Sequence, residues 1–279
     1  CIPSPLLALS TLLLGASLTE SAMMPRKQSS SLAENPGQNP LCERNWIIAI
    51  STGRAGSTSL MGMLNDVPRI SMYGENEGVL MFAHGQLASH GIDAVDGPYS
   101  HGRLNMPKYF KSLQEFIVNM MGHNDDNADV HYVGYKQLAN RVPSYDFLRQ
   151  AFPCAKIILN YRHNLTAQAE SYEELKWLPK HAGPNYVEEV RPWLRKLTDE
   201  AKEFAARDKN TFPIALEDFS VDKFNDMLRF LGISGCSYHT VAWNNKNGFQ
   251  QDSRDIGVSL TAHTSRFDRV KHVGECVFS

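Results

Sequence analysis

Residues 46–60 read Trp46-Ile47-Ile48-Ala49-Ile50-Ser51-Thr52-Gly53-Arg54-Ala55-Gly56-Ser57-Thr58-Ser59-Leu60 (WIIAISTGRAGSTSL), an apolar run that passes into a loop of small residues. The run is apolar at consecutive positions, which predicts a strand buried on both faces. Small residues and the N-terminus of a following helix bring backbone N–H groups and partial positive charge to one place. Arg54 adds a fixed cation, and three hydroxyl side chains follow it. The segment therefore predicts a cradle for a phosphate or sulfate group.

Four further apolar runs are expected to be buried strands, at residues 69–73, 131–135, 156–161 and 212–216. Apolar residues at spacings of three and four predict helices between the runs. One helix is expected to bury Phe110, Leu113, Phe116, Ile117 and Met120, and another to bury Val190, Leu194, Leu197, Ala201, Phe204 and Ala205. Ser144 and Ser220 are candidate N-caps of two more helices. Strands that alternate with helices predict an α/β fold, a three-layer parallel sheet with helices on both faces.

The first forty residues differ from the rest of the chain. Residues 6–18 form an apolar run of signal-peptide length, followed by a polar stretch that cannot bury enough apolar area to fold. Because the chain starts at Cys1, we expect a fragment whose basic leader is missing. We expect a signal or truncated signal-anchor over residues 1–20, a disordered linker over 21–41 and a catalytic domain over 42–279. An organelle transit peptide or plain disorder are the alternatives for the first segment.

Charge and cysteine content narrow the class of protein. Lys and Arg number 28 against 30 Asp and Glu, a formal net charge of −2, which disfavours nucleic acid as a partner. Apart from Cys1, four cysteines remain: Cys42, Cys154, Cys236 and Cys276. They allow two disulfides in three connectivities, or four buried thiols, and the sequence leaves both open. No Cys or His spacing matches a metal site, so no metal is expected.

The loop after the first strand differs from the Walker A motif, because no Gly-Lys pair is present. The third and fourth predicted strands run into Lys136 and Arg162, where a kinase needs carboxylates to hold Mg²⁺. Cations at these positions favour binding of phosphate or sulfate groups without a metal.

At these residues the sequence resembles the sulfotransferases that use 3′-phosphoadenosine 5′-phosphosulfate (PAPS). Residues 52–58 resemble the family's 5′-phosphosulfate loop, in the Arg form found among Golgi carbohydrate and tyrosylprotein sulfotransferases. Residues 152–162 resemble the strand that delivers a 3′-phosphate-binding Arg, here Arg162, and Ser171 resembles its partner Ser. Residues 134–136 (Gly-Tyr-Lys) and 212–232 resemble further family segments. The resemblance spans residues 46–232 and is closer to the Golgi and bacterial-algal type than to the cytosolic type.

The resemblance implies a P-loop-like nucleotide-binding sulfotransferase fold, with PAPS as co-substrate and 3′,5′-adenosine bisphosphate (PAP) as product. It implies a set of nucleotide-binding residues: Gly53, Arg54, Ala55, Gly56, Ser57, Thr58, Ser59, Arg162 and Ser171. Ser171 lies nine positions after Arg162, one more than in many members. Lys246 and Arg254 are candidates for the late adenosine contacts.

Sulfuryl transfer is an in-line displacement that needs charge stabilisation and a general base. We expect Arg54 and Lys136 to stabilise the transferring group and Glu75, after the second strand, to be the base. Glu77 is the alternative base, and His163 is a third candidate. Acceptor contacts are expected in residues 79–127 and 173–186, and the acceptor is a saccharide, a protein tyrosine or a small alcohol.

The expected compartment is the secretory pathway, as a Golgi-lumen or secreted protein, with another organelle as the alternative. A membrane anchor through the N-terminal segment is part of this expectation. Two other functions stay open: a Mg²⁺-dependent nucleotide or small-molecule kinase, and a catalytically silent sulfotransferase-like domain that binds an anionic glycan or partner.

Overall fold

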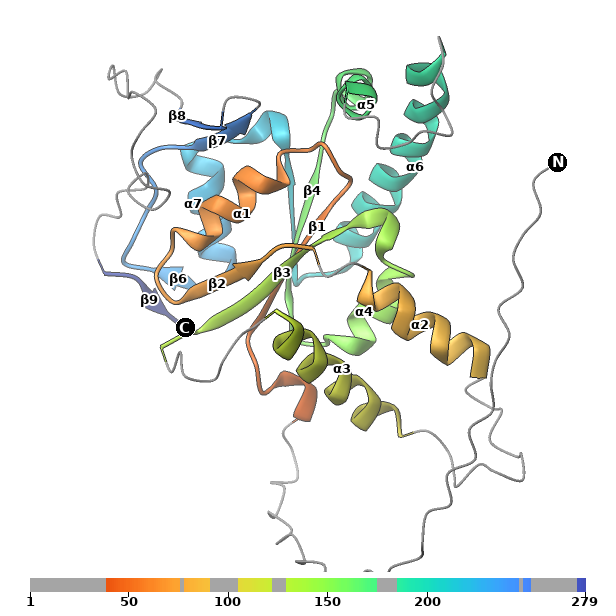
Figure 1. Ribbon diagram of the computed structural model, residues 1–279. Coiled ribbons are helices and arrows are strands. Elements are labelled where there is room, and N and C mark those ends of the chain that lie inside the picture. The colour runs from red at the N-terminus through yellow and green to blue at the C-terminus, as the bar shows by residue number, and fades with distance from the viewer. Residues whose placement is uncertain are drawn as a thin grey trace, which may run out of the picture. The chain divides into compact units, whose positions relative to one another are not determined.

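The computed structural model describes residues 39–75, 78–90, 105–121, 129–174, 185–245, 248–251 and 275–279. A five-stranded sheet lies at its centre, with the strand order β2-β3-β1-β4-β5 (Figure 1). All four strand pairs are parallel. The strands are β1 (Trp46–Ser51), β2 (Ile70–Tyr73), β3 (Tyr132–Leu138), β4 (Lys156–Tyr161) and β5 (Thr211–Ala215). All five carboxyl ends therefore meet at one edge of the sheet.

Every residue of β1 is buried, as its unbroken apolar run predicts. Ile47 and Ala49 pack into one hydrophobic core, and Trp46, Ile48 and Ile50 pack into a second core on the opposite face. The predicted three-layer arrangement is confirmed.

The helices divide between the two faces of the sheet (Figure 1). One face is covered by α1 (Ser57–Asn65) and α7 (Val221–Phe230). The other face is covered by α2 (Val79–His90), α3 (Met106–Met120), α4 (Tyr145–Ala151) and α6 (Tyr186–Arg207). Helix α5 (Leu165–Glu174) packs on the first half of α6 through a smaller apolar cluster. In the described ranges no helix combines the length and apolarity that crossing a membrane requires.

Short elements complete the fold. The 3₁₀ turns are η1 (Pro40–Cys42), η2 (Ala139–Arg141) and η4 (Leu216–Asp218). Strand β6 (Ile233–Ser234) pairs antiparallel with β9 (Val277–Phe278), and β7 (Ala242–Asn245) pairs antiparallel with β8 (Gly248–Gln251). Both predicted N-caps are confirmed, since Ser144 accepts from the N–H of Phe147 and Ser220 from that of Lys223.

The buried face of α3 differs from the predicted one. Phe116 and Met120 were expected in the core, but they are 54% and 44% exposed. Gln114 is buried instead, and its amide donates to the carbonyl oxygens of Leu41 and Ala151. Because these two bonds satisfy the amide N–H donors, Gln114 can lie in the buried face of α3.

Two predicted boundaries also shift. Strand β3 continues to Leu138, so Lys136 lies inside the strand opposite Ala49 of β1, not after it. The side chain of Lys136 is tolerated there because a carboxylate pairs with it. At the other boundary, Leu41 was placed at the end of the linker, but it is 7% exposed and packs in the core.

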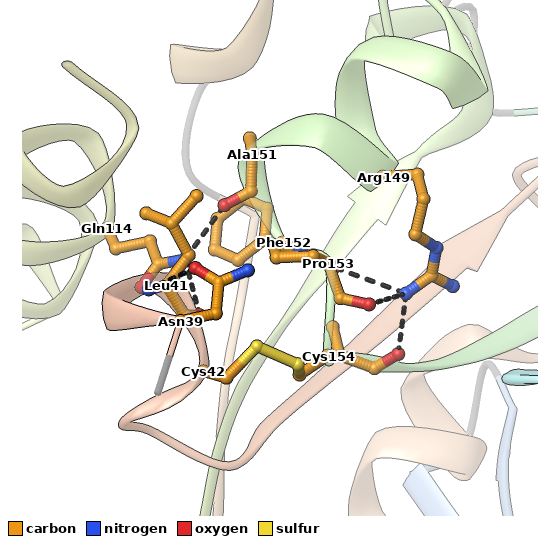
Figure 2. The surroundings of a disulfide bond; sticks show 10 residues. Asn39, Leu41, Cys42, Gln114, Arg149, Ala151, Phe152, Pro153 and Cys154 are labelled. Atoms are coloured by element: carbon orange, nitrogen blue, oxygen red, sulfur yellow. Dashed lines mark hydrogen bonds between the residues drawn. A yellow bond between two sulfur atoms is a disulfide. The ribbon is translucent and has the colours of Figure 1, made fainter. Parts of the chain in front are cut away.

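The four cysteines other than Cys1 form two disulfides, Cys42–Cys154 and Cys236–Cys276. The first joins η1 to the turn before β4, at the amino edge of the sheet (Figure 2). Arg149 braces the same turn, because one of its guanidinium nitrogens donates to the carbonyl oxygens of Phe152, Pro153 and Ala155. Of the two possibilities that the sequence leaves open, disulfides or buried thiols, the structure shows disulfides.

Candidate functional site

The loop after β1 has the backbone of an anion-binding turn. Gly53 and Gly56 both have φ of 77°, and Arg54 between them has φ of 49°. Helix α1 starts after Gly56, an N-cap residue that has no side chain with which to cap the helix. The N-terminal N–H groups of a helix need an acceptor from elsewhere, and the helix dipole favours a negatively charged one.

Two side chains of helix α5 donate hydrogen bonds to this loop. The side-chain amide of Gln168 donates to the carbonyl oxygens of Thr52 and Gly53 and to the Thr52 hydroxyl. Tyr172, one turn later, donates its hydroxyl to the Thr52 carbonyl oxygen over 3.1 Å. Both side chains are buried. Neither residue was singled out from the sequence, because a Gln or Tyr on an amphipathic helix carries no signal of a partner more than a hundred residues away.

Arg54 connects the loop to the same helix. Its Nε donates to the Oγ of Ser171 over 2.9 Å. The structure thus brings together Arg54 and Ser171, two residues that the sequence assigned to opposite ends of one ligand. Ser57 and Ser59 of the loop are buried, whereas Thr58 is half-buried.

Arg162 follows β4 and lies beside Glu217 of η4. Its Nε is 3.7 Å from a carboxylate oxygen of Glu217, and its Nη1 donates to the carbonyl oxygen of Ala167. The Nε atom is buried and makes no hydrogen bond within the described residues. A planar guanidinium with donors to spare suits a phosphate oxygen.

The carboxylate of Glu217 organises the turn between β4 and α5. It accepts the backbone N–H groups of His163 and Asn164 over 2.9 and 3.0 Å. Burial alone would raise the pKa of Glu217, but these N–H groups and the Arg162 guanidinium hold it below its ordinary value. His163 lies 3.8 Å from Asp218, on the exposed side of this turn.

Glu75 lies after β2 between two cations. One carboxylate oxygen is 3.1 Å from Nζ of Lys136, and the other accepts from Arg141 of η2 over 3.1 Å. Arg141 was not expected from the sequence, because η2 carries no recognisable motif. The two contacts fix the carboxylate at the same edge of the sheet as the loop.

Tyr172 of α5 is a buried phenol that bonds to the loop backbone. Its pKa is raised by burial, lowered by the nearby Arg54, and raised by Tyr186 and by Glu75. The net upward shift keeps Tyr172 protonated, as a hydrogen-bond donor must be.

Three candidates lie outside the described residues: Glu77, Lys246 and Arg254. Parts of the two expected acceptor segments lie outside as well, although α2 and α3 account for much of the first. Among the described side chains, no three His, Cys, Asp or Glu gather as metal ligands would.

Comparison with known proteins identifies the family. A family model described as "Sulfotransferase family" matches residues 47–233, well over half of the chain. The chain belongs to the sulfotransferase family. The match covers the sheet from β1 to β5 together with the loop, Glu75, Lys136, Arg162 and Ser171.

The other comparisons add less. The crystal structure of sulfotransferase STF9 from Mycobacterium avium is similar, with 14% sequence identity and a TM-score of 0.38. That similarity covers 67% of this chain and 63% of the Mycobacterium avium protein. None of the curated proteins matches this chain.

Proposed function

We propose that this family member transfers the sulfuryl group of PAPS to a hydroxyl or amine acceptor. The hydrogen bond from Arg54 to Ser171 is the observation that carries the proposal. It joins the loop after β1 to the helix that follows Arg162, so residues suited to the two phosphate-bearing ends of PAPS belong to one connected unit.

The described residues fit the two ends of the nucleotide. The N-terminus of α1, which follows Gly56, and the Arg54 guanidinium provide donors for the 5′-phosphosulfate. Arg162, with its buried Nε, provides donors for the 3′-phosphate. Glu217 competes for that guanidinium only at 3.7 Å, longer than a hydrogen bond.

The chemistry assigned to each side chain follows from its charge. The acceptor oxygen or nitrogen forms a bond to sulfur while the bond from sulfur to the bridging phosphate oxygen breaks. Negative charge grows on that bridging oxygen, where Arg54, Lys136 and the loop N–H groups stabilise it. Glu75 accepts the proton that the acceptor loses.

The two disulfides support a proposed location in an oxidising compartment, in the lumen of the secretory pathway or outside the cell. A saccharide, a protein tyrosine and a small alcohol remain the proposed acceptors. A membrane anchor through the N-terminal segment stays part of the proposal.

Isothermal titration with PAP tests the nucleotide assignment, and we expect one site per chain. The absence of binding heat, confirmed by a competition assay, would remove the proposed function. Incubation with ³⁵S-labelled PAPS and pooled glycans, peptides and metabolites then tests transfer. Binding without transfer to any pool would favour the catalytically silent domain, and Mg²⁺-dependent binding of ATP in place of PAP would favour the kinase.

A further inference from the structure

We propose that Gln168 and Tyr172 are positioning residues that set the direction of the phosphosulfate loop. This inference rests on the proposed function of the loop. The hydrogen bonds described for Gln168 and Tyr172 go to Thr52 and Gly53 of the loop, so we expect their effect mainly at the 5′-phosphosulfate end of the nucleotide site.

The first step is the orientation of the Gln168 amide. Its nitrogen lies within 3.3 Å of three oxygen atoms: the two carbonyl oxygens of Thr52 and Gly53 and the Thr52 hydroxyl. Carbonyl oxygens accept and never donate, so the nitrogen and not the oxygen of the amide must face the loop. Gln168 is fully buried, so no water can replace these bonds cheaply.

The second step follows from peptide geometry. In a trans peptide the C=O and the next N–H point in opposite directions, and the described chain holds no cis peptide bond. Gln168 draws the Gly53 carbonyl toward α5, so the N–H of Arg54 points to the other side of the loop. The preceding peptide is fixed at both ends, because Tyr172 and Gln168 hold the Thr52 carbonyl and Ser51 accepts the N–H of Gly53.

The third step is steric. A Cβ on Gly53 would lie 1.7 Å from the hydroxyl oxygen of Tyr172. Tyr172 thus packs against the loop backbone as well as bonding to it. Gln168, Ser171 and Tyr172 occupy positions i, i+3 and i+4 of α5, which place them on one face of the helix. Side chains on that face of α5 contact the loop and fix its backbone conformation.

The test compares Gln168→Leu and Tyr172→Phe with Tyr186→Phe as the control. Tyr186 is buried in the same small cluster as Tyr172, but its hydroxyl has no hydrogen-bond partner in the described part of the chain. Binding of PAP, 5′-AMP and 3′-AMP is measured for each variant. We expect Gln168→Leu to weaken PAP and 5′-AMP binding at least tenfold, and Tyr172→Phe to weaken both about threefold to tenfold. Binding of 3′-AMP is expected to change less than twofold, and Tyr186→Phe is expected to behave as the unmutated protein.

Equal losses for 5′-AMP and 3′-AMP would show a merely structural role and overturn the inference, as would unchanged PAP binding in both variants. Hydrogen–deuterium exchange of peptides covering residues 52–59, without nucleotide, gives a second readout. We expect faster exchange there in Gln168→Leu and not in Tyr186→Phe, and equal rates would also overturn the inference. If the unmutated protein binds no PAP, the proposed function fails, while the exchange rates still decide whether α5 holds the loop.

Discussion

Gly53 is constrained twice, by its backbone and by its neighbour. Its φ of 77° lies in the left-handed region, which costs other residues about 1 kcal/mol or more. Its Cα also faces the hydroxyl of Tyr172. Either constraint alone favours glycine, and together they leave no room for a side chain.

Gly53→Ala is therefore expected to displace the loop and abolish detectable PAP binding. Titration calorimetry measures the loss. Gly85→Ala in α2 is the matched control, because a Cβ there meets nothing within 4 Å. In that exposed helix position alanine should stabilise the protein by about 0.5–1 kcal/mol. Full nucleotide binding by Gly53→Ala would contradict the tight fit described for the loop.

Arg54→Ala and Arg162→Ala are each expected to abolish nucleotide binding, since each removes a cation from one phosphate-bearing end of the ligand. Arg191→Ala is a suitable control, because Arg191 forms an exposed ion pair with Glu188 on α6. Calorimetry with PAP checks all three variants. If Arg54→Ala and Arg162→Ala both keep the PAP affinity of the unmutated protein, neither residue binds the nucleotide.

Glu75→Gln is expected to keep PAP binding and to lose about 10²–10⁴-fold in turnover, because the amide cannot accept the acceptor's proton. The shape of the side chain and its neighbours Lys136 and Arg141 stay in place. Transfer of ³⁵S from labelled PAPS measures the rate. An unchanged rate in this variant, with a large loss in Glu77→Gln, would move the base to the alternative residue.

At single residues the sequence indicates local backbone conformation, whereas the nucleotide-binding roles stay predictions. Arg54 and Gly56 lie in a compact loop motif, and the structure gives them the backbone that the motif suggests. Gln168, Tyr172 and Arg141 were missed, because their partners lie 66 to 120 positions away. Only the folded chain reveals such pairs, since no local pattern encodes them.

At the scale of elements, Asp208 joins three pieces of structure. It follows α6, accepts from Asn210 and Thr211 at the start of β5, and pairs with Arg149 of α4. Burial raises its pKa, but these hydrogen bonds and the Arg149 charge outweigh burial and lower the pKa below the ordinary 3.8.

The direction of that shift fixes a pH dependence. A carboxylate with a lowered pKa stabilises the fold above its ordinary pKa, and the contribution is lost as the pH falls through the lowered value. Asp208→Asn should cost about 1–3 kcal/mol in the free energy of unfolding at pH 7, and this difference should shrink below pH 3.8. Urea titrations at several pH values measure it. Asp199→Asn, at an exposed position of α6, serves as the control and should have little effect at any pH.

Most elements could be predicted from the sequence, because strands buried on both faces read as unbroken apolar runs. The strands β1 and β4 have the predicted bounds, and the other three end or begin within a few residues of them. The face of α3 was wrong because periodicity ranks Gln114 as polar and therefore exposed. Hydropathy alone cannot predict that a polar residue is buried when its amide N–H groups donate to carbonyl oxygens inside the protein.

At the scale of the whole molecule, two disulfides each close a long segment of the chain. Cys42–Cys154 closes a separation of 112 residues at the amino edge of the sheet, and Cys236–Cys276 closes one of 40 residues beyond β6. Loop-closure entropy gives about 5 kcal/mol for the first and about 4 kcal/mol for the second, as upper values.

Replacing Cys42 and Cys154 by Ser is expected to lower Tm more than replacing Cys236 and Cys276. When folded, the Cys42/Cys154 variant is expected to bind PAP with unchanged affinity, because Arg54 and Arg162 lie at the carboxyl edge of the sheet and this disulfide lies at the amino edge. Calorimetric melting and PAP titration below Tm check the two statements. Loss of PAP affinity in a folded Cys42/Cys154 variant would show that this disulfide affects the nucleotide site.

The order of strands could not be read from the sequence, although the layers could. Apolar runs show that strands are buried, but not which strand lies beside which. Gly134 shows one cause, because a Cβ there would lie 2.2 Å from the carbonyl oxygen of Ile47 and 2.4 Å from the Met72 sulfur. Close contacts of this kind between β3 and its neighbours β1 and β2 favour the observed strand order. They form between segments that are far apart in the chain, so no local pattern predicts them.

The central place of β1 has a consequence during synthesis. This strand leaves the ribosome before both of its neighbours, β3 and β4, which begin only at Tyr132 and Lys156. The nascent chain therefore carries an unpaired Trp-Ile-Ile-Ala-Ile segment for more than eighty residues of elongation. Exposed apolar segments of this kind are prone to aggregation. High-level recombinant production should therefore depend on chaperone supply and on slow translation.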